Sequence, residues 1–143
     1  KATHAESYAE DNALSTWIKY IYLPIDKLIG QVINPFPKQF RALSADPYDD
    51  DLMDSFCSYL EESQKKIKKV QEIFSSRAAP STIKNFCLNL YHCISEVQDG
   101  LNELELYTTG YVDNYLHDGQ EMLRQAKKKR LQLKEEKKHI PIG

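Results

Sequence analysis

Residues 82–106 carry the longest helical pattern of apolar side chains in the chain. The apolar residues recur in steps of three and four, at Ile83, Phe86, Cys87, Leu90, Ile94, Val97, Leu101 and Leu104. This spacing places them on one face of a helix of about seven turns, because an α-helix has roughly 3.6 residues per turn. We therefore expect residues 82–106 to form a central helix around which the rest of the chain packs.

A second long helix is predicted over residues 47–75. It begins with a strong start signal, in which Asp46 caps the first free N–H groups and Pro47 takes the first helical position. Only a short connection at residues 77–81 separates this helix from the central one. Short loops join antiparallel neighbours, so residues 47–106 are expected to form an antiparallel hairpin at the centre of the fold.

The two ends of the chain also follow a helical pattern. Residues 4–33 are predicted to be helical with a stop or kink before Pro24, and the prolines around Phe36 are expected to impose extended backbone. Gly110 is expected to end the central helix in a left-handed conformation, and a last helix follows it. The sequence therefore predicts an all-α fold, a compact bundle of four to five helices. We expect a single helical domain over residues 1–143, with residues 139–143 as a loose tail.

Composition excludes several classes of protein. The chain has 143 residues and a formal net charge of −2, which gives no general attraction to nucleic acid. It contains no apolar run long enough to span a membrane. No signal peptide is visible, and a chain that starts at Lys1 is expected to be a processed protein or a fragment.

The three cysteines, Cys57, Cys87 and Cys93, limit the possible disulfides. In an antiparallel hairpin, Cys57 and Cys93 lie about 27 Å and 18 Å from the turn, and Cys87 lies about 9 Å from it. A disulfide requires Cα atoms within roughly 7 Å. Cys57–Cys93 is therefore the pairing that we expect, provided that the helices tilt. Three free thiols and a Cys57–Cys87 bridge are the alternatives.

Catalytic and metal-binding patterns are missing from the sequence. The aspartates at residues 46–54 lack the glycine and the alternation of a calcium-binding loop. His92 is next to Cys93, but adjacent helical side chains diverge by about 100°. We therefore expect no enzyme activity, no metal site and no cofactor.

A basic stretch, Lys127–Lys138, ends the last helix. Three interpretations are open. It is a solvated helix end whose lysines complement the helix dipole, a contact for an acidic partner protein, or a nucleic-acid contact. The last is the weakest, because Glu135 and Glu136 interrupt the run and no aromatic residue lies within it.

Three segments resemble the anopheline mosquito salivary family that includes albicin and anophensin. They are Ser15–Leu28, Asp51–Glu61 and Cys87–Val97, about a quarter of the chain. The resemblance implies a secreted, extracellular helical protein of saliva that evades host defence by binding a host plasma protein complex. The activities of that family are inhibition of the alternative complement pathway, at its C3 convertase, and of contact activation. The odd number of cysteines departs from a family with paired cysteines, and the resemblance assigns no partner-binding residue.

Two functions from different classes are therefore expected. The first is a secreted complement inhibitor that acts by protein–protein binding. The alternative is an intracellular helical adaptor or interaction domain of a larger protein, which binds its partner through the basic C-terminal helix.

Overall fold

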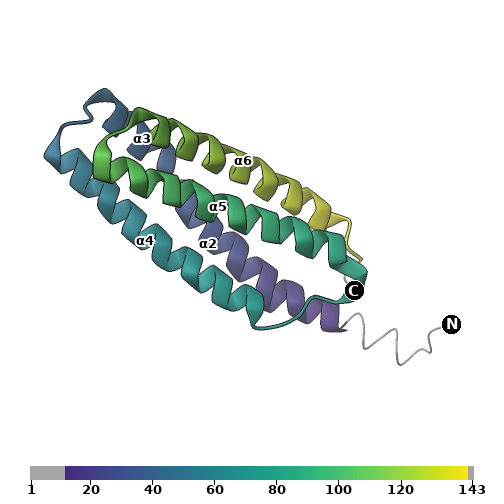
Figure 1. The fold of residues 1–143 in the computed structure, drawn as a ribbon. Coiled ribbons are helices and arrows are strands. Elements are labelled where there is room, and N and C mark those ends of the chain that lie inside the picture. Colours follow the sequence, from purple (N-terminus) through teal and green to yellow (C-terminus); the bar gives the residue numbers. More distant parts are fainter. Residues whose placement is uncertain (1–11, 142–143) are drawn as a thin grey trace, which may run out of the picture.

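The computed structural model describes residues 12–141, and every regular element within them is helical (Figure 1). Residues 12–17 are α-helical and continue through a π-helical segment, Ile18–Tyr22, into α2 (Leu23–Ile33). The following helices are α3 (Phe36–Ala45), α4 (Asp50–Ser75), α5 (Lys84–Gly110) and α6 (Asp113–Lys138), with a 3-10 turn at Ser81–Ile83. The described residues thus form four long helical segments and the shorter α3, which confirms the predicted all-α bundle.

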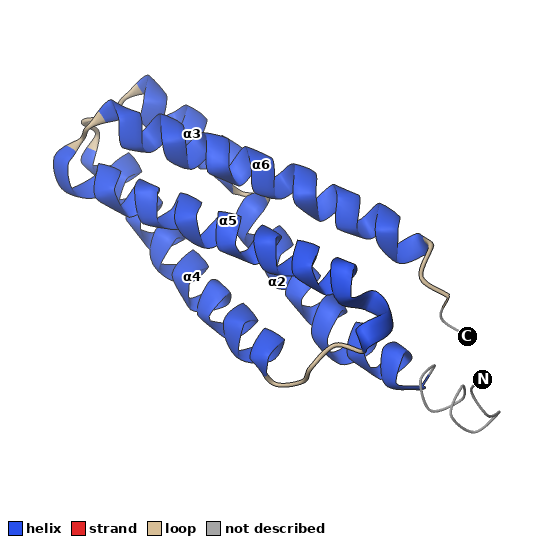
Figure 2. Ribbon diagram, turned by 45° about the vertical axis from the view of Figure 1, so that its right-hand side comes forward, coloured by secondary structure: helices blue, strands red, loops and turns tan. Residues whose placement is uncertain are grey.

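The long helices pack in the order of the chain. Helix α2 packs on α4, α4 packs on α5, and α5 packs on α6 (Figures 1 and 2). Helices α4 and α5 form the predicted antiparallel hairpin, but α5 has its closest partner in α6. Helix α3 contacts mainly α4 and α2. Helices α2 and α6 touch only lightly, so the bundle closes weakly on that side.

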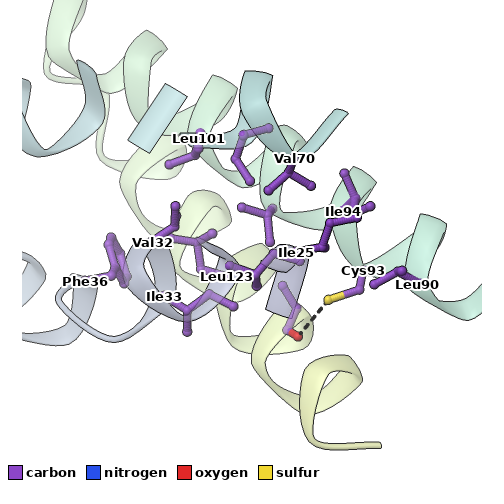
Figure 3. Close-up of a cluster of buried hydrophobic side chains, with 14 of the residues drawn as sticks. Ile25, Val32, Ile33, Phe36, Val70, Leu90, Cys93, Ile94, Leu101 and Leu123 are labelled. Carbon is purple, nitrogen blue, oxygen red and sulfur yellow. Dashed lines mark hydrogen bonds between the residues drawn. The ribbon is translucent and has the colours of Figure 1, made fainter. Parts of the chain in front are cut away.

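The core is one continuous cluster of apolar side chains from all these helices (Figure 3). Every predicted stripe residue of the central helix is buried except Cys87, which is half-buried. Trp17 and Tyr22 meet Phe86 edge to face, with ring centroids 6.2 Å and 5.1 Å apart. Burying a large apolar side chain contributes roughly 1.5–3 kcal/mol, so this cluster is the main source of stability.

The helix does not stop at Pro24, so of the predicted stop or kink the stop is wrong. Ile18–Tyr22 is a π-helical turn, and the N–H of Leu23 donates to the carbonyl of Ile18 five residues earlier. Proline lacks an N–H and its ring crowds the carbonyl of the preceding turn. The wider π turn relieves that crowding, so the helix continues across Pro24. The predicted residues 4–11 lie outside the described residues.

The extended segment predicted around Phe36 is also wrong. Pro35 has α-helical dihedral angles (φ −75°, ψ −18°), and Pro37 lies in the first turn of α3. The first N–H groups of a helix have no intrahelical acceptor, so proline loses nothing there. The two prolines therefore start a helix, α3.

Helix α4 begins later than predicted. Asp49, not Asp46, is the N-cap, and its carboxylate accepts from the N–H of Leu52 at 3.0 Å. The N–H of Asp49 donates to the carbonyl of Asp46 at 3.3 Å, so residues 46–49 form a turn before the helix. Asp49 is the N-cap because its backbone is extended, as the backbone of an N-cap residue typically is.

The left-handed residue after α5 is Tyr111 (φ 57°, ψ 26°), whereas Gly110 is the last helical residue. This conformation costs a non-glycine residue roughly 1–2 kcal/mol. The Tyr111 ring packs 6.0 Å from Tyr107 and 5.7 Å from Tyr48. These contacts offset part of the strain at the turn that directs α6 back along α5.

The end of the chain is partly described. After α6, the N–H groups of His139 and Ile140 donate to the carbonyls of Glu136 and Lys137, and Ile140 packs against the core. The rest of the predicted tail includes residues 142–143, which lie outside the described residues. The single domain over residues 1–143 remains a prediction.

Candidate partner-binding surface

Helix α6 carries a regular stripe toward the bundle. The residues of this stripe are spaced by three and four: Leu116, Gly119, Leu123, Ala126, Arg130 and Leu133. All are buried except Arg130, which is half-buried. A charged side chain therefore occupies a core-facing position in a stripe that is otherwise apolar or small.

The side of α6 that faces α5 is packed through glycine. A Cβ atom on Gly119 would lie 2.6 Å from the Leu104 side chain and 3.1 Å from the carbonyl oxygen of Gly100. Only glycine permits this approach, because a Cβ atom at these distances would be closer to its neighbours than van der Waals contact allows. Across the same contact the Cys93 thiol donates to the Ala126 carbonyl at 3.5 Å (Figure 3).

The side of α6 that faces α2 is held by charge. The Arg130 guanidinium donates to Asp26 at 2.8 Å, across 104 residues of sequence, and the two side chains are only 15% and 17% exposed. Lys134 lies 4.0 Å from the other Asp26 oxygen. Arg130 also lies over Gly30, where a Cβ would be 2.6 Å from its guanidinium nitrogen.

A groove opens between α3 and α6. Its volume is about 380 Å³, and its walls are largely apolar: Ile33, Phe36, Pro37, Phe40 and Leu123. Figure 3 shows Ile33 and Leu123 close together, with Phe36 on the same side of the core. Gln120, Leu123, Arg124 and Lys127 line the α6 side, at a spacing that puts them on one helix face. The groove forms where α3, which packs mainly on α4 and α2, comes near α6 chiefly through Phe40, whose ring centroid lies 6.1 Å from that of His117.

Three cations lie on the rim of the groove. They are Arg41, Arg124 and Lys127. Arg124 donates to Glu121 at 3.1 Å, while Arg41 and Lys127 form no ion pair with any residue that the structure describes. Hydrogen bonds from Gln125 and the neighbouring Arg124 hold the pKa of the Glu121 carboxyl below its usual range. The rim therefore has an excess of positive charge.

The structure divides the basic stretch Lys127–Lys138 into three parts. Arg130 is directed into the bundle, and Lys129 lies 3.7 Å from Glu96 on α5. Lys138 pairs with Glu135 at 3.1 Å along the helix. Lys127 borders the groove and Lys128 is exposed. The stretch is thus not a uniform solvated end.

The predicted Cys57–Cys93 disulfide is absent, and all three cysteines are free. Cys57 is exposed on α4, whereas Cys93 is buried and directed toward α6. The two thiols lie on different sides of the hairpin, because Cys93 faces away from α4. The Cys57–Cys87 alternative is not formed either.

Among residues 12–141, burial raises the pKa of each thiol, which disfavours the reactive thiolate. The pKa of the Cys93 thiol is raised to about 12. His92 is exposed, and His117 lies 3.6 Å from Asp113 on the same helix. Within residues 12–141, no three His, Cys, Asp or Glu side chains are grouped so that they could hold a metal ion. Among the described helices, none has the length and apolar character needed to cross a membrane.

The groove was not predicted from the sequence. Its apolar residues look like ordinary core residues, and its cations look like solvated charges. The periodicity of α6 could have placed Arg130 on the buried stripe, where it requires an acidic partner, but it gives no signal for the groove.

No curated protein and no solved structure matches the chain. Residues 9–141 match the family model described as the cyanobacterial DnaJ chaperone, C-terminal domain. This match contradicts the resemblance to the anopheline salivary family. The inferences from that resemblance are wrong with it, namely inhibition of complement, host plasma partners and secretion in saliva. The matched segment covers almost the whole chain, and the chain therefore belongs to the family of cyanobacterial DnaJ chaperone C-terminal domains.

Proposed function

We propose that this chain is an interaction domain through which a DnaJ-type chaperone holds a partner polypeptide inside the cell. The match of residues 9–141 to a chaperone domain family is the observation that carries this proposal. It agrees with the alternative expected from the sequence, a helical interaction domain. The groove between α3 and α6 supports it, because an apolar concave surface next to exposed cations suits a protein ligand.

We further propose that the domain works by binding alone. The raised pKa values of the thiols support this proposal, since a thiol nucleophile reacts as the thiolate. The surroundings of the two exposed imidazoles support it as well: His92 packs against the Tyr91 ring, with centroids 5.8 Å apart, and His117 lies 3.6 Å from Asp113.

Light scattering tests the proposal. A chemically denatured, reduced protein is diluted into buffer with increasing amounts of the 143-residue chain, and its aggregation is followed. We expect the scattering to fall as the chain approaches equimolar amounts, because a bound non-native polypeptide is withheld from aggregation. An unrelated helical protein of similar size is the control. Unchanged scattering at molar excess, together with no co-elution of the two proteins, would overturn the proposal.

A further inference from the structure

We infer that the groove between α3 and α6 binds a partner segment in which large apolar side chains lie next to carboxylates. The inference rests on the proposed function and specifies the chemistry of the partner. It follows from two properties of the groove, its open aromatic wall and its cationic rim.

The apolar half of the site is provided mainly by α3. Phe36 is buried at its base, Phe40 is half-buried and Pro37 is exposed, so the wall continues from the core to the surface. Leu123 forms the opposite side from α6. A volume of about 380 Å³ lies within the range of pockets that enclose a ligand, and it accommodates one or two large side chains.

The cationic rim of the groove favours a partner segment with negative charge. Arg41 is on α3, and Arg124 and Lys127 are on α6, so cations stand on both sides of the apolar wall. The carboxylate beside them, Glu121, is already engaged by Arg124 and Gln125. Leu131, which is 54% exposed, continues the line of Arg124 and Lys127 at helical spacing. Carboxylates of a partner are attracted to such a rim, and basic segments are repelled by it.

Other acidic ligands fit these observations less well. Nucleic acid also carries negative charge, but the net charge of the chain is −2, which disfavours approach of a polyanion as a whole. A short acidic segment avoids this repulsion, because it meets only the local rim. Its apolar side chains fill the groove while its carboxylates reach Arg41 and Lys127.

Fluorescence anisotropy with designed peptides tests the inference. The probe is a short labelled peptide in which leucines stand beside glutamates. One matched peptide has lysine in place of glutamate, and another has alanine in place of leucine. We expect the probe to bind at least about tenfold more tightly than either matched peptide, because one of them lacks the carboxylates and the other lacks the large apolar side chains.

Charge reversal on α6 provides the matched variants. Lys127→Glu alters the rim, while Lys128→Glu makes the same change one residue away, on the exposed side of the helix. We expect Lys127→Glu to weaken probe binding by about tenfold and Lys128→Glu by less than about twofold. Circular dichroism confirms that both variants fold. An equal loss in the two variants would show general attraction to a basic helix and would overturn the inference.

The remaining outcomes separate the inference from the proposed function. If the chain prevents aggregation of the denatured protein but does not bind the probe, the groove inference fails and the proposed function stands. If it does neither, both fail. Preference for anionic phospholipid vesicles over the probe would also overturn the inference.

Discussion

The two contacts of α6 with its neighbours are built from opposite chemistry. On the α5 side, Gly100 and Gly119 bring the two helices so close that one added methyl group would collide. On the α2 side, the ion pair of Asp26 and Arg130 connects helices that otherwise touch lightly. The first contact fixes α6 in the bundle, and the second is looser. The groove lies between α6 and a third helix, α3.

This difference has an energetic consequence. Close apolar packing gains many small dispersion contacts, whereas an ion pair near the surface contributes little net free energy. We therefore expect the α5–α6 contact to separate only with global unfolding, and the α2–α6 contact to open at a lower free energy. Substitutions on the two sides of α6 test this expected difference.

The largest effect is expected for Gly119→Leu. The new side chain has to displace Leu104 or the Gly100 backbone, both of which lie within 3.1 Å of the added Cβ. Overpacking of this kind destabilises by about 3 kcal/mol. Urea unfolding followed by circular dichroism measures the change in the free energy of unfolding.

Gly110→Ala is the control for that substitution. The nearest atom to its added Cβ is Cγ2 of Val112 at 3.8 Å, an ordinary contact, and its backbone is helical. We expect it to be neutral or stabilising by up to about 1 kcal/mol, as for glycine replaced within a helix. Equal destabilisation at both glycines would contradict the role of close packing.

Alkaline pH probes the same side of α6 through Cys93. Its pKa is raised from 9.0 to about 12 in the folded state, so the neutral thiol is favoured by folding. This contribution is complete below about pH 9 and is lost as the pH rises toward 12. Urea unfolding at increasing pH measures the loss. In Cys93→Ser, whose hydroxyl does not ionise, the loss should be smaller; an unchanged pH dependence would contradict the assignment to Cys93.

A smaller effect is expected for Arg130→Ala on the other side of α6. The substitution leaves Asp26 without its closest partner in a site that is only 17% exposed, and we expect a loss of about 1–2 kcal/mol. Lys128→Ala, at an exposed position without an ion pair, should change stability by less than about 0.5 kcal/mol. Amide hydrogen exchange should become faster in α2 and not in α5. A loss larger than that of Gly119→Leu would reverse the order of the two contacts.

The smallest effect is expected for Tyr111→Gly at the turn between α5 and α6. Glycine removes the left-handed strain but also the ring contacts with Tyr107 and Tyr48, so we expect a net stabilisation of about 0.5–1 kcal/mol. Thermal unfolding measures it. Tyr111→Phe keeps the strain and the ring, and should behave like the original chain.

The helices could be predicted from the sequence because their apolar periodicity is local. The stripe of the central helix was correct at Phe86, Leu90 and Leu101, all of which are buried. The ends of the helices were less predictable, because the effect of a proline or an aspartate on a helix depends on its position in that helix. Pro24 is accommodated by a π turn, and Asp49 becomes the cap only because its own backbone is extended.

The binding surface could not be predicted, since it depends on how distant helices meet. Nothing near Asp26 in the sequence shows that Arg130 will reach it. The groove arises from the position of α3, which is set by its packing on α4 and α2. The family could not be inferred from the helical pattern, because many unrelated bundles share that pattern.

Site-specific photo-cross-linking tests the central claim, that the groove between α3 and α6 holds the partner polypeptide. A photoreactive amino acid is placed at Arg41, on the rim of the groove, or at Lys68, an exposed cation on α4 outside the groove. Each chain is mixed with a denatured protein and irradiated. We predict strong cross-links from position 41 and weak ones from position 68. Equal yields, or a higher yield from position 68, would contradict the account.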